Sequence, residues 1–255
     1  MKNYALIGEH LGHSHSPQVH TEIFKAMNVE GNYTKIECKK EDLKGLIDDL
    51  RNGKYYGFNV TIPYKLEIMK YLDEIDSKAK EIGAVNTVAI KNGKVIGYNT
   101  DYYGFKEELE YFNVPCKNKN AYILGTGGAS LAVSKSLVDL GANVVFVSRN
   151  PKNSNTITYD ELATREIDVL VNATPVGMFP DVNSSPVDEK IVKNAKYCLD
   201  LIFNPEITKF LSYANSKMNG FYMLVGQAIK SEEIWQDKKC NEDIEVIIKR
   251  VKEMI

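Results

Sequence analysis

Residues 121–130, AYILGTGGAS, join a short apolar strand to a glycine-rich turn and the start of a helix. In dinucleotide-binding folds, glycines at such a turn let the backbone approach a pyrophosphate, and the N-terminus of the next helix attracts its charge. The usual G-x-G-x-x-G spacing would place a third glycine at position 130, where this chain has Ser130. The stretch therefore predicts a nucleotide-binding turn, and a strand-to-helix turn that binds nothing is the alternative.

The next strand, predicted at 144–147, is followed by Ser148 and Arg149. An acidic residue at this tip would favour NAD by binding the ribose 2′-hydroxyl, whereas Arg149 suits a 2′-phosphate, with charge assistance from Lys152. Two ordinary solvated basic residues are the alternative. Only eight residues, 149–156, precede the next apolar segment, fewer than the dozen or so that a parallel crossover usually needs. We expect a loop there in place of a crossover helix.

Outward from this motif, short apolar strands alternate with amphipathic helices along most of the chain. The alternation predicts an α/β fold with largely parallel sheets and a domain boundary near residues 101–103. Asn92 and Gly93 form a strong turn pair, which predicts a hairpin. The other elements are expected as strands at 4–8, 33–37, 57–60, 84–90, 95–98, 122–124, 169–172 and 198–201, and as helices at 17–27, from about 41, 64–72, 103–112, 131–140, 227–235 and 241–254.

The composition of the 255-residue chain is that of an ordinary globular protein, with 44% apolar and 26% charged residues. A formal net charge of −2 gives the chain no excess of positive charge with which to bind nucleic acid or an anionic membrane. No apolar run approaches the roughly 20 residues of a membrane helix, and the N-terminal segment has the pattern of a strand and not of a signal peptide. Four scattered cysteines without a C-x-x-C pair favour a reducing cytoplasm.

All four histidines lie between positions 10 and 20. Their spacings fit no common zinc pattern, and no nearby cysteine or carboxylate completes a ligand set, so we expect no metal. We expect instead a loop at the carboxyl end of the first strand, where ligands bind in open α/β sheets. Ser14 and Ser16 would offer hydroxyls to a polar ligand there. Loop capping, with Ser16 as the cap of a helix starting at Pro17, is equally plausible.

Three polar residues stand out beside apolar strands in the first half of the chain. Lys65 is expected at a helix start, where its charge opposes the helix dipole, although most such lysines are simply exposed. Asn86 lies in an apolar strand and must find hydrogen-bond partners if it is buried. Asp101 ends a strand as a candidate acid, or caps the helix predicted from Tyr102.

Together these segments resemble the shikimate dehydrogenase family over nearly the whole chain. The resemblance rests on eight motifs in order: HSHSP (13–17), NVTIPYK (59–65), GAVNT (83–87), GYNTD (97–101), GTGGAS (125–130), NATPVGM (172–178), DLIFNP (200–205) and GFYMLVGQA (220–228).

The resemblance implies a two-domain enzyme that reversibly reduces 3-dehydroshikimate to shikimate with NADPH, without a metal and as a monomer or homodimer. Residues 1–101 plus 225–255 would bind substrate, and a Rossmann-like domain at 102–224 would bind NADP. Lys65 would be the catalytic group, paired with Asp101, with either Lys65 or a water delivering the proton. Substrate would be held by Ser14, Ser16, Thr61, Asn86, Gln227 and the residue at 203; cofactor by Gly125, Thr126, Gly127, Gly128, Ala129, Ser130, Ser148, Arg149, Lys152, Thr174, Leu201, Gly220 and Met223.

The chain departs from the family pattern at two places. Phe203 replaces the family's usual tyrosine, whose hydroxyl contributes to substrate binding. The 149–156 segment is short and has Asn153 where the family usually has a second basic residue, which weakens the preference for NADP over NAD. Two alternatives follow: a dual quinate and shikimate dehydrogenase, and a non-catalytic dinucleotide sensor on the same fold. We expect Trp235 in the core and not at an interface.

Overall fold

The structure is a computed structural model that describes residues 1–12, 14–151 and 153–255. It contains two compact units, Met1–Gly104 with Val225–Ile255, and Phe105–Leu224. Both boundaries between the units fall inside helices, namely α4 (Thr100–Tyr111) and α9 (Phe221–Gln236). Among the described residues, no helix is both long and apolar enough to cross a membrane.

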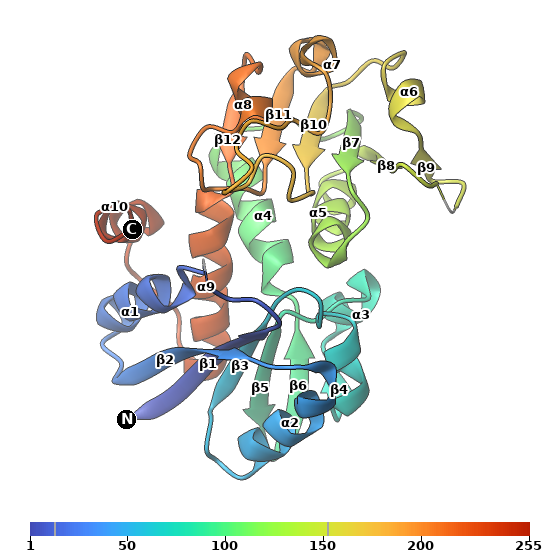
Figure 1. Cartoon of the computed structure of the whole chain (residues 1–255). Helices are drawn as coiled ribbons and strands as arrows, with labels where there is room; N and C mark the ends of the chain where they lie inside the picture. The colour runs from blue at the N-terminus through green and yellow to red at the C-terminus, as the bar shows by residue number, and fades with distance from the viewer. Residues whose placement is uncertain (13, 152) are drawn as a thin grey trace. The chain divides into compact units, whose positions relative to one another are not determined.

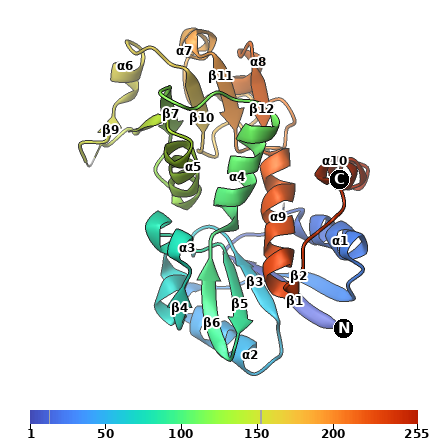
Figure 2. The same cartoon turned by 180° about the vertical axis from the view of Figure 1, so that it is seen from behind.

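The first unit is built on a six-stranded sheet (Figures 1 and 2). Its strand order is β2-β1-β3-β5-β6-β4. The pairs β1–β2, β1–β3 and β4–β6 are parallel, whereas β5 runs antiparallel to both β3 and β6. The strands are β1 (Lys2–Gly8), β2 (Gly31–Glu37), β3 (Gly57–Val60), β4 (Glu74–Ile75), β5 (Thr87–Lys91) and β6 (Lys94–Tyr98).

Alternating side chains of β1 separate the two hydrophobic layers of this unit. Tyr4 and Leu6 pack in a cluster with Phe24 of α1 and Trp235 of α9, whereas Ala5 and Ile7 belong to the cluster on the other face. That alternation is the period-two pattern of a strand that is covered on both sides. The helical segments of the unit besides α4 and α9 are α1 (Ser16–Met27), η1 (Lys40–Asp42), α2 (Leu43–Arg51), η2 (Glu67–Tyr71), α3 (Ser77–Ile82) and α10 (Ile244–Lys252).

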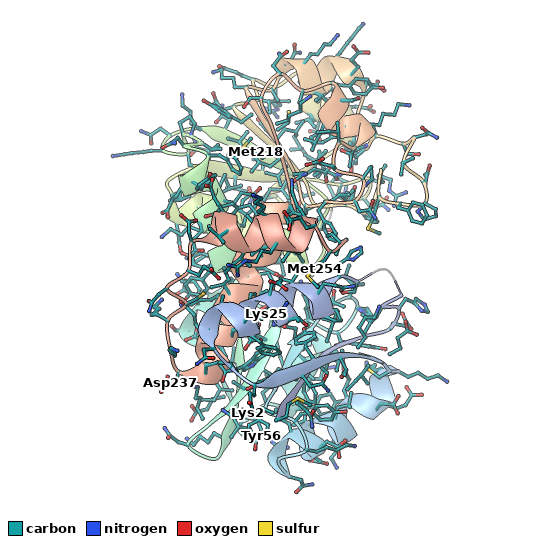
Figure 3. All side chains as sticks on the ribbon, turned by 90° about the vertical axis from the view of Figure 1, so that its left-hand side faces the viewer. Lys2, Lys25, Tyr56, Met218, Asp237 and Met254 are labelled. Carbon is teal, nitrogen blue, oxygen red and sulfur yellow. The ribbon has the colours of Figure 1, made fainter. Side chains whose placement is uncertain are left out.

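Trp235 is a core residue, as the sequence predicts. Its indole is 8% exposed, its Nε1 donates to the carbonyl oxygen of Val88 at 3.0 Å, and its ring stacks on Tyr4 at 4.8 Å between centroids. A Cβ on Gly57 would lie 2.2 Å from the indole Nε1. Only glycine therefore fits at the start of β3. At that amino-terminal edge of the sheet, Lys2 lies over the Tyr56 ring at 5.4 Å (Figure 3).

The second unit holds a six-stranded, fully parallel sheet in the order β12-β11-β10-β7-β8-β9. Numbered from β7, this order is the 3-2-1-4-5-6 arrangement of dinucleotide-binding sheets. Ile123 of β7 faces a cluster with α4 and α5, and its neighbour Leu124 faces a cluster with α6, α7 and α8. The elements are β7 (Asn120–Leu124), α5 (Gly128–Asp139), β8 (Asn143–Val147), β9 (Thr156–Ile157), α6 (Tyr159–Leu162), β10 (Val169–Asn172), α7 (Glu189–Asn194), β11 (Tyr197–Asp200), α8 (Lys209–Ser212) and β12 (Lys217–Asn219).

The two-domain α/β class predicted from the sequence is confirmed, as is the Asn92-Gly93 hairpin, in which both turn residues have positive φ. Strands β8 and β9 are parallel neighbours without a helix among the described residues between them. The sheet of the second unit therefore keeps its strand order, although the described residues between β8 and β9 form no crossover helix of the kind usual in such folds.

Several predicted boundaries are wrong. The predicted helix 64–72 is a turn followed by the 3-10 helix η2. Ser16 is the first helical residue of α1 and not its cap, because His15 takes the capping position. Helix α5 begins within the glycine-rich turn, at Gly128 and not at 131. Helix α9 begins at Phe221, six residues before the predicted start at Gln227, so that residues 221–226, expected outside a helix, are helical.

Candidate active site

Three strand ends meet at one edge of the first unit's sheet. Because β5 is antiparallel to β3 and β6, its amino end lies beside their carboxyl ends. The register places Asn59 opposite Thr87, and Thr87 opposite Tyr98. Polar residues from the three segments 59–61, 86–87 and 98–101 are thereby gathered at this edge, although they are up to about 40 positions apart in the chain.

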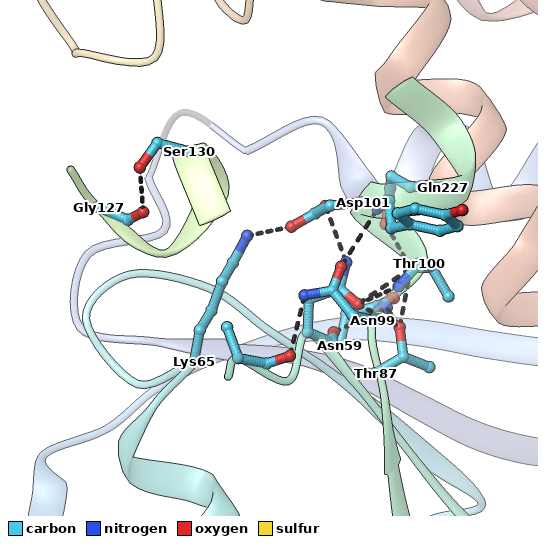
Figure 4. Close-up of polar contacts among 12 residues, drawn as sticks. Asn59, Lys65, Thr87, Asn99, Thr100, Asp101, Gly127, Ser130 and Gln227 are labelled. Carbon is cyan, nitrogen blue, oxygen red and sulfur yellow. Dashed lines mark hydrogen bonds and ion pairs between the residues drawn. The ribbon is translucent and has the colours of Figure 1, made fainter. Parts of the chain in front are cut away.

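Lys65 and Asp101 form an ion pair at this edge (Figure 4). The Lys65 Nζ lies 2.6 Å from Asp101 Oδ2, and the two side chains are only 12% and 9% exposed. The turn after β3 holds Lys65 in place, since its carbonyl oxygen accepts the Val85 N–H at 2.8 Å. A lysine ammonium beside a largely buried carboxylate is an arrangement suited to proton transfer.

The other oxygen of the Asp101 carboxylate is held by Asn86. Asn86 Nδ2 donates to Asp101 Oδ1 at 2.8 Å. Asn86 Oδ1 accepts the backbone N–H of Thr100 at 2.6 Å, which fixes the orientation of the amide. The prediction that Asp101 caps a helix from Tyr102 is wrong: α4 begins at Thr100, and the Asn99 side chain accepts the Tyr102 N–H. The carboxylate is therefore left for Lys65 and Asn86.

The two serines of the loop after β1 are next to each other. Ser14 Oγ donates to Ser16 Oγ at 3.1 Å and accepts the Ser16 N–H at 3.3 Å. Glu37, at the end of β2, anchors the loop by accepting the Leu11 N–H at 2.7 Å. Both serines are half-buried. The loop thus presents two hydroxyls together at the carboxyl end of β1.

Thr61 and Gln227 are placed by different segments. Thr61 directly follows β3, and its N–H donates to Ile7 of β1 at 3.0 Å. A Cβ on Gly8 would lie 2.7 Å from Thr61 Cγ2, so this threonine covers the end of β1. Gln227, on α9, accepts the Thr100 hydroxyl through Oε1 at 3.4 Å. Of the predicted substrate residues, Asn86 and Gln227 thus join the Lys65–Asp101 group through hydrogen bonds.

The histidines do not form a site among the residues that the structure describes. His13 lies outside those residues. His10 is exposed, and the ring of His20 is buried, with Nδ1 2.6 Å from Glu232 Oε1. No group of three histidine, cysteine or acidic side chains that could hold a metal occurs in the described ranges.

The glycine-rich turn of the second unit lies at the point where the strand order reverses, between β7 and β10. Gly125 has φ +102°, and a Cβ there would lie 3.0 Å from Thr174 Cγ2. Gly127 caps α5 in an extended conformation, with Thr126 and Gly127 exposed and Gly128 and Ala129 half-buried. The backbone N–H groups of this helix start can hold a pyrophosphate.

Ser130 fits at the position of the missing third glycine because its hydroxyl bonds back into the turn. Its Oγ donates to the Gly127 carbonyl oxygen at 2.6 Å, and the residue is fully buried (Figure 4). The serine therefore closes the turn without occupying the exposed space above Gly127. The turn is therefore closed by a hydrogen bond at the position where the usual motif has its third glycine.

A buried carboxylate joins the loops after β10 and β11. Asp200 Oδ1 accepts Asn172 Nδ2 at 3.0 Å, and its Oδ2 accepts the Thr208 hydroxyl at 2.6 Å. Asn172 Oδ1 in turn accepts both the N–H and the hydroxyl of Thr174. Burial raises the pKa of Asp200 to about 6, against the opposing effect of these hydrogen bonds. The Thr174 loop is thereby fixed to the end of β11.

The remaining predicted cofactor residues lie on three segments of the second unit. A Cβ on Gly220 would lie 2.2 Å from the Leu201 carbonyl oxygen, so these two residues are in close backbone contact. Met223 is 7% exposed within the hydrophobic core. Ser148 and the exposed Arg149 follow β8, with Ser148 N–H bonded to Ile157. Lys152 lies outside the described residues.

The residues that hold the site residues in place were not among those predicted from the sequence. Most of them share one available signal, a polar side chain next to an apolar strand end, whereas Ser231 lies among other polar residues of α9. Their partners could not be named because they come from distant segments. The missed residues are Asn59, Thr87, Thr100, Asn172, Asp200, Thr208 and Ser231.

A parallel sheet with a glycine-rich turn at its switch point, together with a separate sheet that carries a desolvated lysine–aspartate pair, defines a two-domain α/β oxidoreductase that binds a dinucleotide. Residues 6–88 match the family model of the shikimate dehydrogenase substrate binding domain. The shikimate dehydrogenase (NADP(+)) of Clostridium beijerinckii is 44% identical over 93% of each chain. The chain belongs to the shikimate dehydrogenase family.

Solved structures agree with this assignment. A chorismate mutase/shikimate 5-dehydrogenase fusion protein from Clostridium acetobutylicum has a TM-score of 0.96 and 44% identity, covering 100% of this chain and 98% of that one. Shikimate 5-dehydrogenase from Thermus thermophilus, in complex with NADP(H) and shikimate, has a TM-score of 0.90 and 29% identity, covering 100% of both chains.

Proposed function

We propose that this chain catalyses the reversible, NADPH-dependent reduction of 3-dehydroshikimate to shikimate, a step towards the aromatic amino acids. The observation that carries the proposal is the Lys65–Asp101 pair at 2.6 Å, held by Asn86 at the polar edge of the first sheet. The curated relatives with this architecture are named shikimate dehydrogenase (NADP(+)). A protein that only sensed a dinucleotide would have no use for such a pair.

Reduction of a ketone needs a hydride at carbon and a proton at oxygen. NADPH supplies the hydride when it is bound. The ammonium of Lys65 supplies the proton to the carbonyl oxygen as negative charge develops there, and is reprotonated from solvent. Asp101 orients Lys65 through the 2.6 Å contact and is itself oriented by Asn86. In the reverse direction, neutral Lys65 accepts the hydroxyl proton of shikimate.

The first unit, which contains the predicted substrate domain 1–101 plus 225–255, would bind the substrate. The paired hydroxyls of Ser14 and Ser16 are suited to the substrate carboxylate, because hydroxyls donate to its oxygens. Thr61, Asn86 and Gln227 would hold ring hydroxyls together with Asp101. Phe203 would lie against the substrate without the hydroxyl of the family's tyrosine.

The second unit, which makes up the predicted cofactor domain 102–224 apart from residues 102–104, would bind the cofactor. The turn 125–130 would hold the pyrophosphate, and Arg149 and Ser148, with Lys152, would bind the 2′-phosphate, which favours NADP over NAD. Thr174, Leu201, Gly220 and Met223 would line the nicotinamide side. No metal is needed, since Lys65 supplies the charge at the carbonyl oxygen. The described cysteines are all free thiols, in keeping with the cytoplasm as the location of the enzyme.

The proposal is tested by following nicotinamide absorbance with purified protein and four pairs of reactants: shikimate or quinate, each with NADP or NAD. We expect shikimate with NADP to be the fastest pair. Equal or faster turnover of quinate would make the chain a dual-substrate relative, and faster turnover with NAD would contradict the role given to Arg149. A folded chain that binds NADP but turns over none of the pairs would be a sensor.

A further inference from the structure

Three buried hydroxyls form a closed triangle beneath the Lys65–Asp101 pair. The oxygens of Thr87, Thr100 and Ser231 are 3.0 to 3.1 Å apart in all three pairs, and all three residues are fully buried. They come from the amino end of β5, the start of α4 and the middle of α9. Ser231 is separated from its two partners by 144 and 131 positions in the chain.

Each hydroxyl of this triangle has one proton to donate and an oxygen that can accept. Ser231 Oγ donates to the Gln227 carbonyl oxygen at 2.9 Å, one helical turn earlier. Its lone pairs are therefore left to accept, from Asn59 Nδ2 at 2.9 Å and from the threonines. A hydroxyl has one proton, so each threonine donates only once. Both threonines reach Ser231 Oγ and, at 3.1 Å, Asn86 Oδ1, and Thr100 also reaches Gln227 Oε1 at 3.4 Å.

The way in which the threonine protons are shared among these acceptors determines how Asn86 is held. Its Oδ1 accepts the Thr100 N–H and a threonine hydroxyl, so that Nδ2 is directed to Asp101. Without the Ser231 oxygen, both threonines lose a shared acceptor, so that the hydrogen bonds to Asn86 Oδ1 and, for Thr100, to Gln227 Oε1 must be redistributed, and Asn59 loses an acceptor. A fully buried cluster cannot replace these partners with bulk water, so its members must shift to pair again.

We propose that Ser231 is a positioning residue for the reaction: its hydroxyl joins α9 to β3, β5 and α4 and thereby fixes Asn86, the carboxylate of Asp101 and the direction of Lys65. This inference rests on the proposed function. Ser231 touches none of the reacting groups itself and acts through the threonines and Asn86. Small errors in the placement of a reacting group cost much of the rate, because the advantage of a bound reactant lies in its orientation.

The test compares Ser231→Ala with a matched control, Ser136→Ala. Ser136 is also fully buried, and its Oγ also donates to the carbonyl oxygen one helical turn earlier, that of Ala132 at 3.0 Å, but it lies on α5 of the second unit. For Ser231→Ala we expect kcat with shikimate and NADP to fall about tenfold or more, with KM changed less than about threefold. For Ser136→Ala we expect kcat to stay unchanged at a comparable loss of melting temperature.

Two further measurements separate positioning from general destabilisation. Ser231→Thr keeps a hydroxyl on the same carbon and is expected to recover most of kcat, even if its added methyl lowers the melting temperature. In the NMR spectrum, the Asn86 side-chain amide is expected to shift and to exchange faster in Ser231→Ala, and this readout does not depend on turnover.

The inference is overturned if wild-type protein is active and Ser231→Ala keeps its kcat, or if Ser136→Ala loses kcat to the same extent. It is also overturned if folded Ser231→Thr shows no recovery. If the wild-type chain turns over no shikimate, the proposed function fails and the catalytic role of Ser231 fails with it. The Asn86 amide signal then still shows whether the hydrogen bonds act as described.

Discussion

Asp101 holds the ammonium of Lys65 at 2.6 Å through one carboxylate oxygen and the amide of Asn86 at 2.8 Å through the other. Both oxygens are thus committed to partners that differ in charge. An asparagine at 101 would keep an acceptor for Asn86 but would remove the negative charge opposite Lys65. The role of the carboxylate charge can therefore be tested separately from the shape of the site.

For Asp101→Asn we predict a fall in kcat of about 10²–10⁴, the usual contribution of positioned acid–base groups. Steady-state kinetics with shikimate and NADP measure it. The control is Asp49→Asn on α2, which removes the carboxylate that pairs with Lys54 at 2.7 Å on the surface and should leave kcat unchanged. A kcat for Asp101→Asn within threefold of wild type would show that the charge is not needed.

The raised pKa of Asp200 makes stability depend on pH. Its pKa in the folded protein is about 6, above the usual 3.8, so the folded state holds this proton more tightly than the unfolded state. The stability contributed by the neutral acid is therefore present below about pH 4 and is lost as pH rises through about 6. At 1.36 kcal/mol per pKa unit, the loss approaches about 3 kcal/mol at pH 7.

Asp200→Asn removes this ionisation and should abolish that pH dependence. The free energy of unfolding of the variant, relative to wild type, should increase by up to about 3 kcal/mol between pH 4 and pH 7. Denaturant unfolding at the two pH values measures it. Any constant effect of the amide on the bonds to Thr208 and Asn172 cancels in the comparison. An identical difference at both pH values would show that Asp200 titrates normally.

Arg149 is expected to set the preference for NADP. Arg149→Ala should raise the KM for NADP by about ten- to a hundredfold, because guanidinium–phosphate hydrogen bonds are charge-assisted, and should change the KM for NAD little. Arg165→Ala removes another exposed arginine from the same unit and serves as the control for net charge. Equal effects of the two substitutions, or equal effects on both cofactors, would assign the 2′-phosphate to other groups.

Phe203 lacks the hydroxyl that the family usually has at this position. Its ring packs edge-on to Phe221, with 6.0 Å between centroids, and is partly exposed. Phe203→Tyr should lower the KM for shikimate by up to about tenfold, since one hydrogen bond contributes about 0.5–1.5 kcal/mol. An unchanged KM in kinetic assays would count against any contact between residue 203 and the substrate.

Glycine at 220 is expected to be essential for local structure. An added Cβ would lie 2.2 Å from the Leu201 carbonyl oxygen, which is backbone and cannot rotate away. We predict that Gly220→Ala destabilises the protein by about 1–3 kcal/mol in denaturant unfolding. Gly45→Ala is the opposite control: this glycine lies in α2 with open space around it, and alanine there should stabilise by up to about 1 kcal/mol. Similar effects at both positions would refute the argument from close contact.

Much of the fold could be predicted from short sequence patterns, because an apolar run indicates a strand and a turn pair such as Asn92-Gly93 indicates a hairpin. Strand 57–60 matches β3 at both ends, and the short segment after Arg149 has no crossover helix among its described residues. The helix predicted at 64–72 is wrong: residues 64–66 belong to a turn in which the Lys65 carbonyl oxygen accepts the Val85 N–H, and residues 67–71 form a 3-10 helix. Asp101 could be the cap or the acid on sequence alone; the choice depended on Asn99 taking the capping bond.

The supporting residues were beyond sequence reasoning for a different reason. Ser231 has the appearance of one more polar residue on a helix, and its meaning comes from partners 131 and 144 positions away. Asp200 and Asn172 likewise become a pair only when β11 and β10 lie side by side. Such contacts are created by the sheet topology and not by any local pattern.

The catalytic role of Lys65 is tested most simply by comparing Lys65→Ala with wild type. Turnover is followed by NADPH absorbance, and shikimate binding is followed by calorimetry. We predict that wild type reduces NADP with shikimate, and that the variant binds shikimate within about tenfold of wild type while kcat falls by about 10²–10⁴. If the variant oxidised shikimate at the wild-type rate, Lys65 would not be the catalytic group.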